Sequence, residues 1–472
     1  MAKPTRMTTP RHRGRHDAFA MLAALVLAGG TAVFGPAKAN DKLPGDPASP
    51  EAGEAPAPPT TLDETLRVAF ENNPQLHAAF ARWQAARERI PQARALEDPA
   101  LSFETFVEQV DTRYRVSVTQ RFPAFGARRQ RERRAAAEAR AAQHLFEAER
   151  IDLYERVVRA FHEYRYLARA SEVTEANLRL LTQLEQAIDA RYRDGNAPFA
   201  DLIRVRIEHD RLADRMAALH DQRRPRSADL AALLNLPADD PLPWPAGGAA
   251  TAMPLDENEL AGRLTELNPE LKAMAARIEA AVYGEDLARR DGWPRPMLGA
   301  GWMAMRGMDG RADETDIGLM AGISLPIWRS RIRAGRREAE ALTQAAIHEQ
   351  DARTRRARAN LSMAVFQFRD AERRLRLFQE SLIPSAEQAL EVIRHAYAEG
   401  GAGFTDLIDA QRTLLEFQLL TERAAADREI AIGDIGFGVV TSNVPTSDTA
   451  DRSDPPDPSD RPAPQDRPEA PR

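Results

Sequence analysis

Apolar positions recur every three or four residues along most of this chain, which is the period of an α-helix. Residues 127–193 contain neither glycine nor proline. Their apolar stripe comprises Leu153, Val157, Phe161, Tyr164 and Leu167. At a rise of about 1.5 Å per residue, a helix over these roughly 67 residues would be about 100 Å long. The spacing of the stripe is typical of coiled-coil packing, so we expect a long helical arm that packs against another helix.

A second arm of similar length is predicted over residues 336–399. Pro384 interrupts it and removes one backbone hydrogen bond, so we expect a local kink there. Each arm is followed by a shorter helical pattern, at residues 199–223 and 404–434. Pro225 is expected to end the first of these, with a last short helical turn at 230–236. The pattern therefore predicts two helical hairpins.

In two places the apolar period changes to two, which predicts β-hairpins. The first lies between Pro99 and Pro123 and turns at Asp111-Thr112, and the second spans residues 297–325. The apolar side of these strands comprises Leu101, Phe103, Val107, Tyr114, Val116, Val118, Phe122, Ile317, Leu319, Ala321, Ile323 and Leu325. Strands of about ten residues can cross a bilayer at the tilt of a barrel. A half-buried hairpin of a soluble protein shows the same alternation, so both interpretations stay open on this pattern alone.

The two helical hairpins turn at stretches that share the pattern G-x-x-x-F-x-D-L-I and lie about 205 residues apart. One stretch begins at Gly195 and the other at Gly400. Glycine is favoured just after a helix because it adopts the left-handed backbone that satisfies the last carbonyl groups. We therefore expect these two glycines to end the long arms.

The sequence is an internal duplication, because the order of motifs in the first half returns in the second. An Asn-Pro pair that separates two helices occurs at Asn73-Pro74 and again at Asn268-Pro269. Segments outside the repeats have the Pro- and Asp-rich composition of disordered chain. The predicted organisation is a signal peptide at 1–39, a disordered linker at 40–60, a first structural repeat at 61–236, a linker at 237–254, a second structural repeat at 255–441 and a disordered tail at 442–472.

The N-terminus has the three parts of a secretory signal. Basic residues come first, an apolar run at 18–28 follows, and Ala37-Lys38-Ala39 fits the small-x-small cleavage pattern. The alternative is an uncleaved membrane anchor, but about 11 apolar residues are fewer than the roughly 20 that a spanning helix needs. We expect cleavage after Ala39 and export from the cytoplasm.

The composition argues against several classes of function. The formal net charge is -6 and the chain contains no cysteine, which excludes disulfides, thiolate metal sites, cysteine nucleophiles and a lipid-anchored cysteine. No histidine pair has the spacing of a zinc site, and neither a catalytic carboxylate pair nor a glycine-rich phosphate loop stands out. We therefore predict that the protein is not an enzyme and has no cofactor, no metal site and no nucleic-acid partner.

Two clusters of residues allow a functional and a structural interpretation. Thioethers suit Cu(I), but methionines on a strand and its loop also serve as apolar filler, which we favour. Arginines after each β-hairpin can contact lipid headgroups or simply begin a solvated helix, and both interpretations stay open. The methionines are Met297, Met303, Met305 and Met308, and the arginines are Arg128, Arg129, Arg131, Arg133, Arg134, Arg329, Arg331, Arg333, Arg336 and Arg337.

The four predicted strands of one chain are too few to close a membrane barrel, because the smallest such barrels have about eight. An open sheet edge cannot lie in hydrocarbon, since its backbone groups would be left without hydrogen-bond partners. Two copies would supply about eight strands and three copies about twelve. The predicted fold class is therefore mainly α with a small β part, in which duplicated long α-helical hairpins form a tunnel and four strands per chain contribute to a shared transmembrane β-barrel.

This order of motifs resembles the TolC family of outer-membrane efflux proteins over nearly all of residues 60–440. The Asn-Pro breaks, the two tips and the F-P-x-F-G-x-R-R sequence from Phe122 to Arg129 carry the resemblance, and the last is similar to the heavy-metal efflux branch. The resemblance implies a homotrimer in the lipid of the outer membrane, with a periplasmic extension. Its function would be that of a passive exit duct in a tripartite efflux system. The implied partners are a periplasmic adaptor protein and an inner-membrane pump of the RND type. The alternative is a periplasmic coiled-coil adaptor or scaffold protein of a transport system.

The resemblance also assigns roles at the tips. The acids of the family's periplasmic aperture fall on Asp406 and Asp409, where a ring of carboxylates would favour cations. Asp201 and Tyr397 match two members of the network that closes this aperture. N-capping of the return helices is an alternative role for Asp201 and Asp406.

The arginine of the closing network is replaced by Ala402, so we expect Arg204 or Arg394 to substitute for it. Apolar residues and glycines at the tips are expected to contact the adaptor. These residues are Gly195, Phe199, Leu202, Gly400, Phe404 and Leu407. The apolar side chains among them could instead form a staple that holds each hairpin closed.

Overall fold

The computed structural model describes residues 58–106, 112–247, 256–305 and 314–439. The chain divides into two compact units, and all the described elements belong to the second, Pro58–Arg472. The predicted signal peptide, the first linker up to residue 57, the C-terminal tail, Asp111 and Met308 lie outside the described residues. The boundaries of the two repeats stay predictions.

The first helices of each half begin at side chains that cap them. Thr61 and Glu64 form a capping box at the start of α2 (Leu62–Asn72). Asn73 then ends α2 and caps α3 (Pro74–Arg94), because its Oδ1 accepts hydrogen bonds from the N–H groups of Gln75 (2.9 Å) and Leu76 (3.2 Å). Asn268 separates α6 (Glu257–Leu267) from α7 (Pro269–Arg290) in the same way. The two Asn-Pro breaks are confirmed.

The first long arm is the continuous helix α4 (Ala127–Arg193), 67 residues as predicted. The second arm consists of α8 (Arg329–Leu377), the π-helical segment η1 (Phe378–Leu382) and α9 (Ile383–Ala398), and so begins earlier than expected. The π-helix lies directly before Pro384, where the Ile383 N–H donates to the Phe378 carbonyl. The arm accommodates its proline by this widened turn rather than by ending.

The prediction that Pro225 ends the first return helix is wrong, because α5 (Phe199–Leu234) continues through it. Beyond the proline, Leu230 and Leu234 are buried against α4 and α2, and the buried Ser227 Oγ accepts a hydrogen bond from the Leu242 N–H. Burial of this turn outweighs the roughly 3 kcal/mol that a proline costs inside a helix. The second return helix is α10 (Phe404–Val439). None of the described helices combines the length and the apolar character needed to cross a bilayer.

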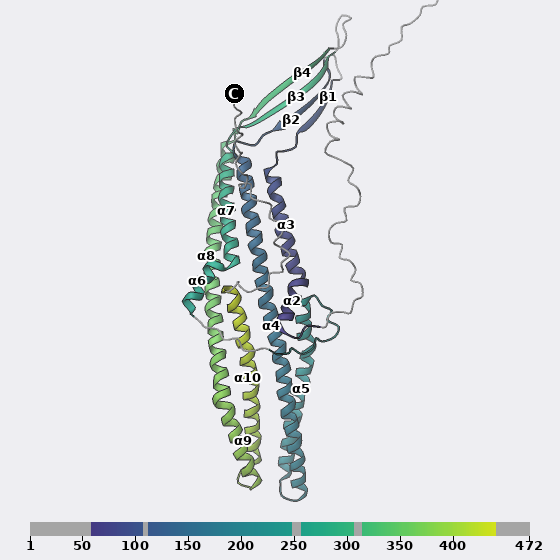
Figure 1. Ribbon diagram of the computed structural model, residues 1–472, viewed down its shortest axis with the longest axis vertical. Coiled ribbons are helices and arrows are strands. Elements are labelled where there is room, and N and C mark those ends of the chain that lie inside the picture. Colours follow the sequence, from purple (N-terminus) through teal and green to yellow (C-terminus); the bar gives the residue numbers. More distant parts are fainter. Residues whose placement is uncertain (1–57, 107–111, 248–255, 306–313, 440–472) are drawn as a thin grey trace, which may run out of the picture. The chain divides into compact units, whose positions relative to one another are not determined.

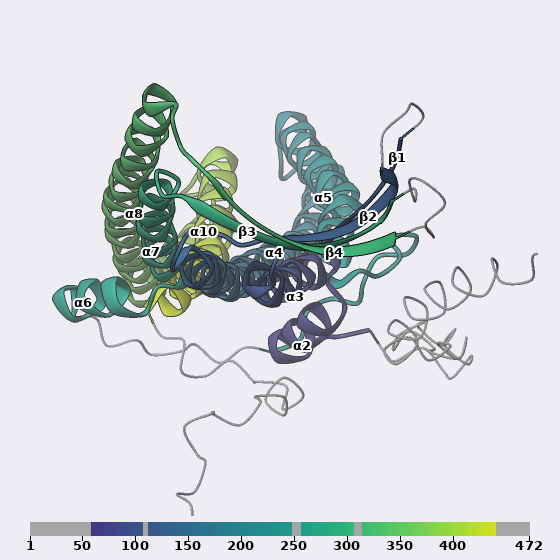
Figure 2. The same cartoon turned by 90° about the horizontal axis from the view of Figure 1, so that it is seen from above.

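The strands β1 (Ala100–Thr105), β2 (Thr112–Arg121), β3 (Arg295–Met305) and β4 (Glu314–Ser324) form one antiparallel sheet in this order (Figure 1). Seen from above, the sheet is curved (Figure 2). Its register pairs Phe103 with Val116, Val116 with Trp302 and Trp302 with Ile317. Side chains that face each other across strands share a face, so the apolar sides of the two predicted hairpins form one continuous surface.

This apolar face is exposed to an unusual degree for a folded chain. Leu319 is 88% exposed and Ile317 80% exposed, whereas an ordinary sheet would bury such residues against a core. The opposite face combines polar and small residues with Met297, Met303, Met305 and Met320. On this face, Ser102 and Ser117 share a hydrogen bond of 2.7 Å. Within the described residues, β1 and β4 are the two edges of the sheet and each pairs with a strand on one side alone.

The helices continue from the sheet to the hairpin tips, which lie at the other end of this unit (Figure 1). In the described part of the chain, three buried apolar clusters join most of these helices. One joins α4, α2 and α5 around Leu153 and Leu234, and the second joins α6, α8 and α10 around Val365 and Ile435. The third lies at the tips and includes residues of both helical hairpins. The mainly α fold with a small β part is confirmed.

Candidate functional site at the hairpin tips

Both arms end in the same backbone motif. Gly195 and Gly400 have positive φ angles of 72° and 82°, as expected. The Gly195 N–H donates to the carbonyl of Tyr192 (3.0 Å), and the next N–H donates to the carbonyl of Arg191 (2.7 Å). The corresponding bonds after Gly400 are 3.2 and 2.8 Å. A helix end closed by these two hydrogen bonds is a Schellman motif, and it gives the two turns a fixed shape.

The tips of the two hairpins pack against each other through a shared apolar core. Leu202 is 3% exposed, Phe404 2% and Leu407 4%, and they cluster with Leu181 and Ile188 of α4. The expectation that all the apolar tip residues are available to an adaptor therefore needs correction, because these three side chains are covered within the chain.

Phe199 is the exception among the four apolar residues predicted to contact the adaptor. It is 52% exposed and its ring lies 5.3 Å from that of Tyr192. Gly195 and Gly400 are exposed as well, with open space where a side chain would stand. The surface that the first tip offers to another protein thus includes Phe199, Tyr192 and Ile203, and each tip adds an exposed glycine turn.

Asp201 and Tyr397, expected to act together, come from different hairpins and lie close enough to interact. Asp201 is 7% exposed. Burial raises the pKa of Tyr397, and the negative charge of Asp201 raises it further, while the positive charge of Arg191 opposes the shift. The Arg191 guanidinium lies 5.0 Å from the centre of the Tyr397 ring. A basic side chain, an acid and a tyrosine therefore meet at the junction of the two hairpins.

Arg204, one of the two candidates for the missing arginine, lies at this junction. Its Nη1 donates to Thr405 Oγ1 across the hairpins (3.1 Å) and is 3.6 Å from Asp201 Oδ1. Arg394 instead pairs with Glu391 on its own helix. The contact of Arg191 with Tyr397 was missed by sequence reasoning, because a cation–π pair between distant helices leaves no local motif.

The two acids expected at the aperture have different surroundings. Asp406 Oδ2 accepts a hydrogen bond from the Gly403 N–H (3.1 Å) and so caps α10, which was the alternative role. Asp201 cannot make this bond, because Pro198 at the matching position has no N–H. Asp409 is exposed and pairs with Arg412 one turn later (3.2 Å). Both carboxylates remain at the surface of the second tip.

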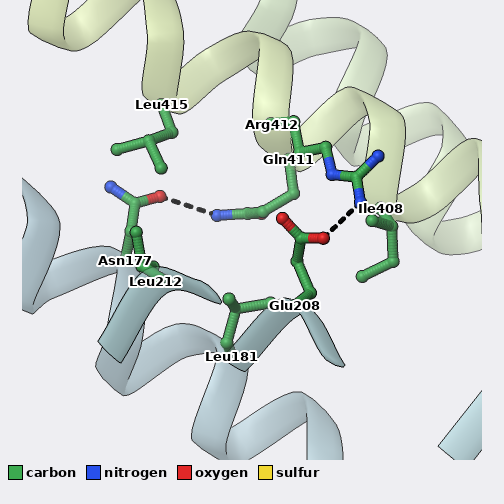
Figure 3. Close-up of a pocket in the computed structure, with 8 residues that line it drawn as sticks. All are labelled: Asn177, Leu181, Glu208, Leu212, Ile408, Gln411, Arg412 and Leu415. Atoms are coloured by element: carbon green, nitrogen blue, oxygen red, sulfur yellow. Dashed lines mark hydrogen bonds and ion pairs between the residues drawn. The ribbon is translucent and has the colours of Figure 1, made fainter. Parts of the chain in front are cut away.

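Above the tips, polar contacts connect α10 to the first hairpin (Figure 3). Gln411 Nε2 donates to Asn177 Oδ1 (2.9 Å), and Arg412 donates to Glu208 of α5. They line a cavity of about 20 Å³, which is room for about one water molecule. Farther from the tips, Arg423 of α10 forms a bidentate ion pair with Glu163 of α4 (2.8 and 3.0 Å). These contacts fix the two hairpins to each other.

The upper end of this series of contacts contains a half-buried acid, Glu155. Burial, together with the charges of Asp434 and Asp152, raises the pKa of Glu155 to about 7. Arg159, which pairs with Asp434 (2.8 Å), opposes the shift. Because the pKa is raised on folding, the contribution of Glu155 to stability is fully present below its unfolded value of about 4.3. It is lost as the pH rises through about 7.

We predict that Glu155→Gln stabilises the protein at alkaline pH, because glutamine avoids a negative charge in a half-buried position. The free energy of unfolding at about pH 8 is expected to rise by on the order of 2 kcal/mol per chain, with little change at about pH 4. Denaturant unfolding at both pH values measures this. An equal gain at the two values would show that packing rather than ionisation is responsible.

Among the residues that the structure describes, no group of three or more His, Asp or Glu side chains is placed to hold a metal ion.

The sequence pattern of the outer membrane efflux protein family matches residues 65–236 and 260–432. The chain belongs to this family. It is 25% identical over 376 residues to the cobalt-zinc-cadmium resistance protein CzcC of Cupriavidus metallidurans, covering 77% of this chain and 86% of the relative.

Solved structures with the same fold include outer-membrane channels and other outer-membrane proteins. The outer-membrane channel OprN superposes with a TM-score of 0.70 at 20% identity, over 80% of this chain and 89% of that one. VceC of Vibrio cholerae gives 0.66 at 20% identity, over 79% and 96%. CusC gives 0.69 at 17% identity, over 80% and 92%. These likenesses show the fold.

Family membership decides between the two functions considered from the sequence. This outer membrane efflux protein is the channel component of an efflux system, located in the outer membrane with a periplasmic extension. The prediction of a TolC-like channel is confirmed, and a periplasmic adaptor is not supported. Proteins of this family act in efflux.

Proposed function

We propose that three copies of this outer membrane efflux protein form one closed duct, through which substrates leave passively. The observation that carries the proposal is the four-stranded sheet with one continuous apolar face and two open edges. Open edges are costly in hydrocarbon, so β4 of one copy would pair with β1 of the next. Three sheets of this kind would supply about twelve strands.

The energy for transport would come from other proteins, since we propose no catalytic role for this chain. A periplasmic adaptor would contact the tips at Gly195, Phe199 and Gly400, which are exposed. The adaptor would link the duct to an inner-membrane pump of the RND type. The relative named as a cobalt-zinc-cadmium resistance protein supports divalent metal cations as the substrate class.

Purification in detergent tests the duct directly. We expect extraction to require detergent, migration in gels to change on heating, and cryo-microscopy to show three copies around one bore. A self-contained monomer, or a protein recovered in the soluble periplasmic fraction, would overturn the proposal.

The aperture acids allow a test of selectivity. We expect Asp406→Ala combined with Asp409→Ala to reduce the preference for cations in single-channel recordings, because each copy would lose two carboxylates at the second tip. Asp239→Ala with Asp240→Ala removes the same charge from an exposed loop remote from the tips and serves as the control. Unchanged selectivity of the tip variant would place Asp406 and Asp409 outside the constriction.

A further inference from the structure

Where the sheet meets the helices, arginine clusters stand beside exposed large apolar side chains. We refer to this region as the junction belt. Its members are Phe125, Arg128, Arg129, Arg131, Arg133 and Arg134 at the start of α4, Trp293 after α7, and Ile327, Trp328, Arg329, Arg331, Arg333, Arg336 and Arg337 at the start of α8. The starts of α4 and α8 and the end of α7 meet the strands at the same end of the unit (Figure 1).

The charge of the junction belt is hardly neutralised. In the described part of the chain, Arg134 pairs with Glu138 (2.9 Å), and Arg336 donates to the Arg289 carbonyl (3.1 Å). The other arginines of the belt have no ion pair among the described residues. Lower in the molecule, arginines such as Arg423 and Arg412 are paired. The belt therefore offers unpaired positive charge to an external anion.

The apolar members of the belt are largely exposed, and contact of such side chains with water is unfavourable. Phe125 is 85% exposed, Trp328 70% and Ile327 66%. They lie three or four residues after the ends of β2 and β4, close to the apolar side of the sheet that includes Ile323 (60% exposed). Tryptophan and other amphipathic aromatics next to arginine are typical of the boundary between hydrocarbon and headgroups.

The turn that presents Phe125 is fixed rather than loose. Gly126 has a φ of 75°, and a side chain there would meet Arg290 Nη1 at 2.7 Å. Arg290 Nη1 donates to the Phe125 carbonyl (2.8 Å), and its guanidinium lies 5.8 Å from the Trp293 ring centre. Arg290 thus connects the start of the first arm to the loop that follows α7.

We propose that the junction belt binds the phosphate headgroups of anionic phospholipids in the periplasm-facing leaflet, with Phe125, Ile327 and Trp328 at the level of the upper acyl chains. Unpaired guanidinium groups supply the charge complementarity, and the continuity with the apolar sheet face sets the depth. This inference rests on the proposed duct, whose sheet inserts in the bilayer.

The test uses full-length protein reconstituted into vesicles in which brominated lipid quenches tryptophan fluorescence. Brominated phosphatidylglycerol and brominated phosphatidylcholine are compared in otherwise identical membranes. We expect Trp328 to be quenched preferentially by the anionic lipid, and Trp328→Phe to identify its share of the signal. Arg329→Gln with Arg331→Gln and Arg333→Gln is expected to reduce the preference at least about tenfold, since each basic residue near an anionic surface contributes to binding.

The matched control replaces three exposed arginines in the middle of α8, Arg355, Arg356 and Arg358, with glutamine. It removes the same charge and is expected to leave the lipid preference unchanged. An equal loss in this control, or no preference in the unmodified protein, would overturn the proposal. Loss of ion selectivity without loss of lipid preference would place the arginines in the bore and would also overturn it. Conductance recorded from the same vesicles distinguishes failure of the belt from failure of the duct.

Discussion

Leu319→Arg is expected to abolish assembly of the duct in a membrane. Leu319 lies in β4 on the apolar face and is 88% exposed, so in the proposed barrel it faces hydrocarbon. An arginine at the middle of a bilayer costs about 2–4 kcal/mol in a β-barrel, and the cost is paid by every copy of the assembly. Folding into lipid vesicles, followed by gel migration with and without heating, measures the fraction that forms the oligomer.

The neighbouring residue provides the control. Met320 is next in the strand and points to the opposite face, where it lies beside Gly299. Met320→Arg would therefore face the water-filled bore, and we expect assembly close to that of the unmodified protein with altered ion selectivity. If both variants assembled equally well, neither face of the sheet would contact lipid. If both failed, the sheet would be buried on both sides.

The parts of this fold that could be predicted from the sequence are those fixed by local chemistry. α4 begins after Gly126 and ends before Gly195, both with left-handed backbone, so its limits follow from where glycine stands. Asn73 and Asn268 mark helix boundaries because their side chains cap the next helix. The apolar face of the sheet follows from alternation, and the register places the two hairpins on one surface.

The parts that were missed depend on contacts between distant segments. Pro225 has a local preference to end a helix, but burial of Leu230 and Leu234 prevails. The positions of Leu202 and Leu407 indicate that each return helix has an apolar side, but they do not show what covers it. In the structure, the other hairpin covers it. The meeting of Arg191 with Tyr397 likewise appears only when the hairpins are placed together.

The duplicated tips have diverged in a way that separates two tasks. Phe199 and Phe404 occupy the same position in the repeated motif, yet one is 52% exposed and the other 2%. At the matching positions before the return helices, the Gly403 N–H donates to Asp406, whereas Pro198 has no N–H to donate to Asp201. Asp201 instead faces Tyr397 and Arg204. We infer that Phe404 adds to the core that both tips share, whereas Phe199 gives the first tip an outward apolar surface.

Phe404→Ala is expected to destabilise the tips, whereas Phe199→Ala is expected to leave their stability almost unchanged. Truncation of the buried Phe404 leaves a cavity that costs about 3–5 kcal/mol in the tip core. Amide hydrogen exchange at residues 400–408 and 181–205 should therefore accelerate, and the mean single-channel conductance should increase as the hairpins separate. Phe199→Ala removes an exposed ring and is expected to cost only about 0.5 kcal/mol, with exchange nearly unchanged. Its effect should appear instead as weaker capture of the adaptor. If Phe199→Ala accelerated exchange as much as Phe404→Ala, the core shared by the hairpins would not be what holds the tips together.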